Sequence, residues 1–301
     1  MKTTAQSREL ITIWGDEMYL RGTYHRCADD DSAGDRGGKR PIGILLLNYG
    51  TTPRSGPGDS LVHWADSFSK LGYPSFRFDL PGLGDSTGEL PKDVLGYVSR
   101  VTASGYTRTV SGIVETITDR FGLQGVIIAG ICAGAVAGLF AAVACEKVEG
   151  LLLFTPYFFL QNFSTARETI HRWGVESRVG RVLRVVYRHV KPLVRRTALP
   201  PNANVPLIRC WQRIASRELP VFVWNRDENL GNFDYMKYLR ANSPRGNIVY
   251  RRVDFPSFVE GIGRHVVQQE LAGWLRDHFP VIQETPAVEE PVTCSEDRRV
   301  H

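Results

Sequence analysis

The sequence predicts an α/β fold in which a mainly parallel sheet carries helices on both faces. Three observations support this prediction. Short hydrophobic runs alternate with segments of helical spacing, which is typical of repeated strand–helix–strand units. Gly125–Gly138 indicates a buried strand, a tight turn and a helix of small residues. A basic stretch with helical spacing at 157–219 then interrupts the alternation, which predicts a helical cap inserted between two core strands.

Two runs that alternate polar and apolar residues open the core. Glu9–Trp14 and Glu17–Arg26 are predicted to form two strands of a hairpin. Pro41–Asn48 and Pro74–Leu80 are short hydrophobic runs, as expected for strands buried in a parallel sheet. Between them, Ser60–Leu71 is predicted to be helical because its apolar residues recur at helical spacing. Those residues are Leu61, Trp64, Phe68 and Leu71.

The second part of the core continues the alternation on both sides of the cap. Val94–Phe121 has a mostly helical pattern, which Gly105 and Gly112 weaken. Gly150–Phe154 is predicted to be another buried strand. After the cap, the sequence predicts a strand at 220–224, a helix at 233–239, a strand at 247–253 and a helix at 264–279.

Composition agrees with a folded core that carries a basic insertion. The chain has 301 residues, of which 43% are hydrophobic and 23% charged, so a sizeable core can form. The formal net charge is +5, and basic residues gather in the predicted cap. The predicted organisation is core at 1–156, cap at 157–219, core at 220–280 and a polar tail at 281–301 that we expect to be disordered.

Five scattered cysteines show no Cys-x-x-Cys spacing, which argues against a disulfide framework and against a zinc site. Reduced thiols fit a cytoplasmic protein, and no apolar signal core follows Met1–Gln6. We therefore expect a cytoplasmic location, and the sequence implies no metal or organic cofactor. Gly125–Cys145 is about long enough to cross a bilayer. Its four glycines, β-branched first half and alanine-rich second half instead favour a buried strand and helix.

Cys132 stands at the tip of the turn inside Gly-Ile-Cys-Ala-Gly, which matches the nucleophile elbow Gly-x-Ser-x-Gly with cysteine in place of serine. Glycine is expected at positions 130 and 134 because strand and helix approach closely there. The following helix points its amide groups at the thiol, which should favour a thiolate. The simpler interpretation is that Cys132 is a small buried hydrophobe.

Two motifs make the chain resemble the α/β-hydrolase superfamily from about Ile11 to Phe279. One is the elbow, and the other is Asp-Leu-Pro-Gly-Leu-Gly-Asp-Ser at 79–86, which resembles the family's Asp-x-x-Gly-x-Gly-x-Ser turn. Within the superfamily, the elbow and the pairs at 226–227 and 232–233 are similar to hydrolases associated with exosortase and exopolysaccharide loci. Those hydrolases also tend to carry cysteine in the elbow.

The resemblance implies a triad acid after the strand predicted at 220–224. Asp227 stands there, where it would orient a histidine and stabilise its cation. Glu228 and Asp234 are nearby alternatives, and the bland interpretation of Asp227 is a solvated loop carboxylate.

The histidine that the resemblance implies is displaced. The family places it within a few residues of the last strand, but 254–258 contains no histidine. His265 comes later, at the start of the last predicted helix, and His278 lies far along that helix. A longer loop would bring His265 over Cys132; otherwise His265 is a surface residue and the triad lacks its base.

The resemblance also implies an oxyanion hole built from two backbone amides. One is that of Ala133, directly after Cys132. The other comes from the loop after the third strand, where Thr51 is the predicted donor and Tyr49 and Gly50 stand where the family usually has His-Gly. A plain turn is the competing interpretation of this loop.

The implied reaction is cleavage or transfer of an acyl group through an acyl-cysteine. A thiol is more acidic than a hydroxyl, so it depends less on a strong base, and thiolates attack thioesters and activated esters readily. The expected substrate is a small acyl compound, including carrier-linked or CoA-linked thioesters. The sequence leaves open whether water, an amine or an alcohol accepts the acyl group, and it leaves the oligomeric state unknown.

The basic cap has three interpretations. It is a solvated helical surface, a lid that binds an anionic ligand, or an amphipathic surface that rests on an anionic membrane. Nucleic acid is not an expected partner, because no recognition motif accompanies the charge. A hydrolase-fold protein that has lost catalysis and binds an anionic or lipid-like ligand stays open as the alternative function.

Overall fold

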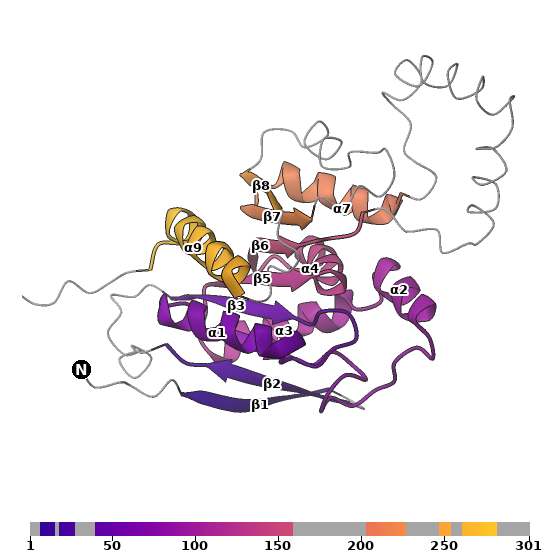
Figure 1. The fold of residues 1–301 in the computed structure, drawn as a ribbon. Coiled ribbons are helices and arrows are strands. Elements are labelled where there is room, and N and C mark those ends of the chain that lie inside the picture. The colour runs from indigo at the N-terminus through magenta and orange to yellow at the C-terminus, as the bar shows by residue number, and fades with distance from the viewer. Residues whose placement is uncertain are drawn as a thin grey trace, which may run out of the picture.

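The computed structural model describes residues 7–15, 18–27, 40–158, 203–226, 247–253 and 261–281. Most of the predicted cap, the helix predicted at 233–239, Asp227 and the predicted tail beyond 281 lie outside these ranges. The described chain is built around one eight-stranded sheet with the order β1-β2-β4-β3-β5-β6-β7-β8 (Figure 1). β1 and β2 pair antiparallel, as do β2 and β4, and the other pairs are parallel. The predicted α/β fold with a mainly parallel sheet is confirmed.

The strands and helices follow the predicted alternation. The strands are β1 Arg8–Trp14, β2 Tyr19–His25, β3 Ile42–Leu47, β4 Ser75–Phe78, β5 Gly125–Ile131, β6 Val148–Phe154, β7 Val221–Arg226 and β8 Ile248–Val253. The helices are the 3-10 turn η2 Pro57–Asp59, α1 Ser60–Lys70, α2 Val94–Thr102, α3 Thr107–Arg120, α4 Ala133–Ala144, α7 Val205–Ser216 and α9 Gly261–His278.

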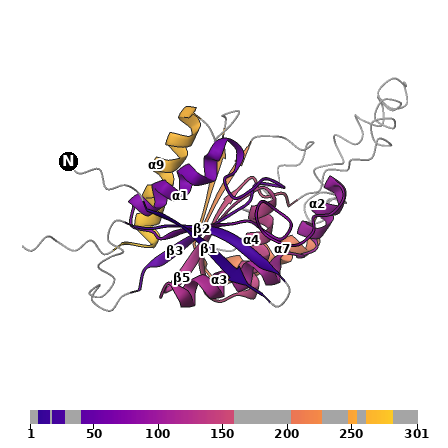
Figure 2. The same cartoon turned by 90° about the horizontal axis from the view of Figure 1, so that it is seen from below.

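Helices cover both faces of the sheet, as Figure 2 shows. α1 and α9 lie on one face, and α3, α4 and α7 lie on the other. β5 is central, and all seven of its residues are buried. Its side chains alternate between the two layers, with Ile127 and Ile131 in the α1/α9 core and Val126 and Ile128 in the α3/α4/α7 core. The strand that leads to Cys132 is therefore packed between two hydrophobic cores.

The long apolar run at 125–145 divides into β5 and α4, as the sequence predicts. α4 is buried on almost every side because it contacts the sheet, α3 and α7. This explains why its residues are small and apolar around the whole helix. Among the described helices, none is both long enough and apolar enough to cross a membrane.

The mostly helical segment 94–121 contains two helices, and only one of its two glycines marks the break. α2 ends in a Schellman motif, in which Ser104 has a φ of 64° and the N–H of Gly105 donates to the carbonyl of Arg100 at 2.9 Å. Gly112 instead lies inside α3, with open space around it. The chain therefore turns at Gly105 and continues as a helix through Gly112.

α7 falls within the range predicted as cap, yet it packs on the core. Leu207, Trp211 and Ile214 are fully buried in the layer that contains α4. Asn204 caps the helix by accepting a 3.1 Å hydrogen bond from the N–H of Leu207. The rest of the predicted cap, 159–202, lies outside the described residues, so its roles as lid or membrane surface stay predictions.

Candidate active site

Cys132 occupies a strained turn between β5 and α4. Its φ of 54° and ψ of −109° lie in a region that residues with a side chain rarely adopt. Its N–H donates a 2.8 Å hydrogen bond to the carbonyl of Phe154 at the end of β6. Such strain persists only where surrounding structure enforces it, and it gathers at functional sites.

The two glycines of the motif permit this turn, as predicted. A Cβ on Gly130 would lie 2.4 Å from the carbonyl carbon of Gly134 and 2.5 Å from the nitrogen of Ala135. A Cβ on Gly134 would lie 2.5 Å from the carbonyl oxygen of Asn48. Strand, helix and the loop after β3 thus meet at backbone distance around Cys132.

The thiol of Cys132 is partly exposed, and two opposing effects act on it. Burial raises its pKa, and a hydrogen bond from the N–H of Ala133 lowers the pKa by less. The amide at the helix end therefore favours the thiolate, as predicted, but burial outweighs it in the described surroundings. The bond does place the Ala133 N–H beside the sulfur, where an oxyanion donor is required.

The loop after β3 forms a turn beside the elbow. The N–H of Thr52 donates to the carbonyl of Tyr49 at 3.1 Å, and Gly50 adopts a φ of 57°. The side chain of Asn48 donates to the carbonyl of Thr52 at 2.9 Å. Within the described residues, the N–H groups of Gly50 and Thr51 donate no hydrogen bond, so both are candidate donors to a ligand oxygen.

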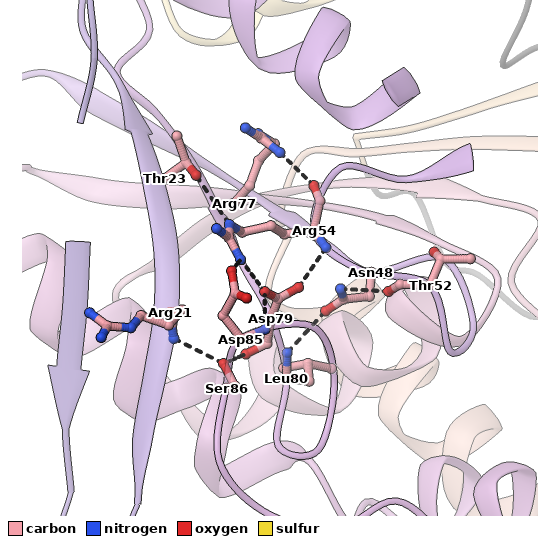
Figure 3. Close-up of polar contacts among 10 residues, drawn as sticks. All are labelled: Arg21, Thr23, Asn48, Thr52, Arg54, Arg77, Asp79, Leu80, Asp85 and Ser86. Atoms are coloured by element: carbon pink, nitrogen blue, oxygen red, sulfur yellow. Dashed lines mark hydrogen bonds and ion pairs between the residues drawn. The ribbon is translucent and has the colours of Figure 1, made fainter. Parts of the chain in front are cut away.

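The Asp-x-x-Gly-x-Gly-x-Ser turn anchors this loop through Asp79, as Figure 3 shows. The fully buried Asp79 carboxylate accepts hydrogen bonds from the N–H of Arg54 at 2.6 Å and of Asp85 at 3.2 Å, and it forms an ion pair with the Arg54 guanidinium. That guanidinium also pairs with Asp85 at 2.8 Å. Ser86 closes the turn by donating to the Asp79 carbonyl at 2.7 Å.

The chain is similar in fold to several solved structures. An esterase from Pyrococcus furiosus matches with a TM-score of 0.60 at 13% identity, over 91% of this chain and 94% of that one. An α/β serine hydrolase without a lid from Xanthomonas campestris matches with a TM-score of 0.53 at 15% identity, over 92% and 97%. The chain has the α/β-hydrolase fold. A Thermus thermophilus protein matches this fold with a TM-score of 0.57 at 16% identity, over 90% and 99%.

No protein-family model and no curated protein sequence matches the chain. At these low identities the structural similarity establishes the α/β-hydrolase fold alone. The finer resemblance to exopolysaccharide-associated hydrolases stays a prediction.

Two tyrosines, the buried Tyr97 and the partly buried Tyr157, interact with the thiol on this α/β-hydrolase fold, and no local sequence pattern indicates either. Tyr97 of α2 and Tyr157, three residues after β6, both interact electrostatically with Cys132 and with each other. Burial is the main cause that raises the pKa of each hydroxyl, so both are neutral donors at neutral pH. Tyr97 donates a 2.5 Å hydrogen bond to the carbonyl oxygen of Gly50.

The other two predicted triad residues lie outside the described side chains. Asp227 directly follows β7, whose residue Trp224 pairs with Phe154 of β6. The backbone that leads to Asp227 therefore leaves the sheet at the edge that carries Cys132. His265 lies in the first turns of α9, and its side chain is outside the described part of the structure. Their approach to Cys132 stays a prediction.

A second, largely buried polar cluster contacts the loop that Asp79 anchors. The Nε of Arg77 donates to Nε2 of His25 at 2.9 Å, so the His25 Nδ1–H donates to Asp66 at 2.7 Å. Burial and the charge of Arg77 lower the pKa of His25 to about 4, so the ring is neutral at pH 7. Arg77 also donates to the carbonyl of Arg54 at 2.7 Å, which joins this cluster to the loop.

In the part of the chain that the structure describes, no three His, Cys, Asp or Glu side chains are grouped so that they could bind one metal ion. The described cysteines are Cys27, Cys132, Cys145 and Cys210, and none of these four is in a disulfide. Of these four, Cys132 alone occupies the turn between β5 and α4.

Proposed function

We propose that the protein is an acyl hydrolase or acyltransferase that works through a covalent acyl-Cys132 intermediate. The observation that carries this proposal is the strained, partly exposed Cys132 with the N–H of Ala133 at its sulfur. A buried structural cysteine needs neither the unusual backbone conformation nor the amide. The hydrolase and esterase names of proteins with the same fold support the reaction class.

The proposed reaction has two steps. The Cys132 sulfur attacks the acyl carbonyl carbon, and the displaced electron pair forms an oxyanion that the N–H groups of Ala133 and Thr51 bind. The bond to the leaving group then breaks, and His265 returns to the leaving group the proton that it took from the thiol. Water or another acceptor attacks the thioester of acyl-Cys132 and restores the thiol.

The thiol needs a base in this scheme. Burial raises the pKa of Cys132 in its described surroundings, so few thiolates form there at neutral pH without help. His265, oriented by Asp227, is the proposed base, and an imidazolium beside the sulfur would offset the cost of burial. Small acyl esters or thioesters, including carrier-linked or CoA-linked ones, are the proposed substrates.

The rate of Cys132 alkylation by iodoacetamide tests this scheme. We expect the thiol to react well at pH 7, faster than the other four cysteines, and the rate to fall at least about tenfold in His265→Gln at the same pH. The alkylation rate of this variant should recover at high pH, where the thiol ionises without a base. Wild-type Cys132 that reacts only above pH 9, with or without His265, would overturn the triad.

The alternative is a hydrolase-fold protein that has lost catalysis and binds an anionic or lipid-like ligand. The raised pKa of Cys132 favours it, because a thiol without a base is a poor nucleophile. This alternative predicts slow alkylation of Cys132 at pH 7 and no acyl adduct, while the fold stays intact.

A further inference from the structure

A hydrogen bond to one carbonyl fixes the peptide unit that contains the predicted oxyanion donor. The described residues contain no cis peptide bond, so the unit between Gly50 and Thr51 is trans. In a planar trans peptide the C=O and the following N–H point in opposite directions. A partner that holds the Gly50 carbonyl therefore also sets the direction of the Thr51 N–H.

Tyr97 is that partner. Its hydroxyl lies 2.5 Å from the Gly50 carbonyl oxygen, and the residue is 5% exposed. The contact joins residues 47 positions apart, so α2 rather than the loop itself controls this peptide. The Thr51 N–H makes no hydrogen bond within the described residues, which leaves it available for an oxyanion.

Among the described residues, no other hydrogen bond holds this one peptide. The N–H of Thr52 and the side chain of Asn48 hold the residues on either side, and Asp79 holds Arg54. Gly50 has no side chain and adopts a positive φ, so its peptide can rotate more readily than those of its neighbours. The Tyr97 hydroxyl removes that freedom.

We propose that Tyr97 is a positioning residue of the oxyanion hole, which orients the Thr51 N–H by holding the Gly50 carbonyl. This proposal rests on the proposed acyl-transfer function. Because the oriented N–H would bind only the carbonyl oxygen, loss of the Tyr97 hydroxyl should slow acylation by any acyl substrate, whatever its acyl chain. The hydroxyl is a positioning group because its hydrogen bond is to the Gly50 carbonyl of the loop.

Two reactions at the same sulfur separate this role from a merely structural one. Acylation of Cys132 by p-nitrophenyl acetate forms a C–S bond, passes through an oxyanion and releases p-nitrophenolate. Alkylation by iodoacetamide forms a C–S bond with release of iodide and passes through no oxyanion. A residue that orients an oxyanion donor should change the first rate and leave the second rate unchanged.

The experiment compares wild type, Tyr97→Phe and Tyr106→Phe. We expect Tyr97→Phe to lower the acylation rate between roughly 10- and 100-fold, with an unchanged alkylation rate. Tyr106→Phe is the matched control because Tyr106 packs beside Tyr97 and its buried hydroxyl has no hydrogen-bond partner among the described residues. Both rates should stay at the wild-type level in this control.

The possible outcomes distinguish failure of the positioning role from failure of the proposed acyl-transfer function on which it rests. Equal losses of acylation and alkylation in Tyr97→Phe would show that Tyr97 acts on the thiol or on the fold, and would overturn the positioning role. Unchanged acylation in Tyr97→Phe would overturn it too. Failure of the wild type to acylate Cys132 at all would instead overturn the proposed function.

Discussion

The side chain of Arg54 and its own backbone N–H both bind the carboxylate of Asp79, and that carboxylate is fully buried. Arg54 lies in the loop that follows β3, whereas Asp79 begins the turn that follows β4. The pair therefore links the segments that follow two neighbouring parallel strands. It lies at the carboxyl ends of the strands, which is also where Cys132 lies. Parallel sheets generally place their ligands at this edge.

Removal of the charge on Asp79 should destabilise the fold strongly. Asp79→Asn leaves the partly buried Arg54 guanidinium without its main partner, and breaking a buried pair in this way costs about 3–5 kcal/mol. Asp85→Asn is the matched control because the Asp85 side chain is 69% exposed, so its loss should cost less than about 1 kcal/mol. Urea unfolding of the two variants measures the difference, and equal midpoints would contradict it.

The glycines of the elbow should tolerate no side chain. Gly130→Ala places a Cβ against the backbone of α4, so we expect a loss of about 1–3 kcal/mol in the free energy of unfolding. Gly112→Ala, in the open middle of α3, should instead stabilise the protein by about 0.5–1 kcal/mol. Thermal unfolding that moves both variants in the same direction would refute the close approach at Gly130.

The free energy of unfolding should fall as the pH is lowered, over a pH range that the pKa of His25 sets. The pKa of His25 is about 4 in the fold and about 6.5 in the unfolded chain, so the unfolded state binds more protons between these values. Stability is therefore unaffected above pH 6.5 and falls as the pH drops from 6.5 toward 4, by about 3 kcal/mol in total. Hydrogen bonds from Arg8 and His25 overcome the effect of burial and lower the pKa of Asp66, so its contribution is lost only at still lower pH.

His25→Gln tests the assignment of that window. The glutamine amide can donate and accept hydrogen bonds, but it takes up no proton. Chemical unfolding at several pH values should therefore show a flatter stability curve between pH 4 and 6.5 than in the wild type. The same slope in both proteins would assign the acid sensitivity to another group.

The sequence alone could predict features that depend on local pattern. The hydrophobic runs gave β3, β5 and β6, and the paired glycines around Cys132 predicted the backbone contact at Gly130. The break at Gly105 was less evident, because its cause is a Schellman motif that uses Ser104 in a left-handed conformation.

Contacts between residues far apart in sequence could not be predicted in this way. Tyr97 lies in an ordinary amphipathic helix, and only the packing of α2 brings its hydroxyl to Gly50. Arg54 follows a proline in a polar loop, and nothing in the neighbouring sequence indicates that it will form an ion pair with Asp79. The net pKa shift of Cys132 could not be predicted for the same reason: the helix end lowers the pKa as expected, but burial by surrounding elements raises it by more.

The most direct test of the central claim is to trap the acyl-enzyme. The protein is mixed with excess p-nitrophenyl acetate and quenched in acid, and the acetylated peptide is then located by mass spectrometry while p-nitrophenolate release is followed. We expect one acetyl group on the peptide that contains Cys132, with both adduct and release abolished in Cys132→Ala. Release that persists in Cys132→Ala, or a wild type that shows neither adduct nor release, would contradict a cysteine nucleophile at the elbow.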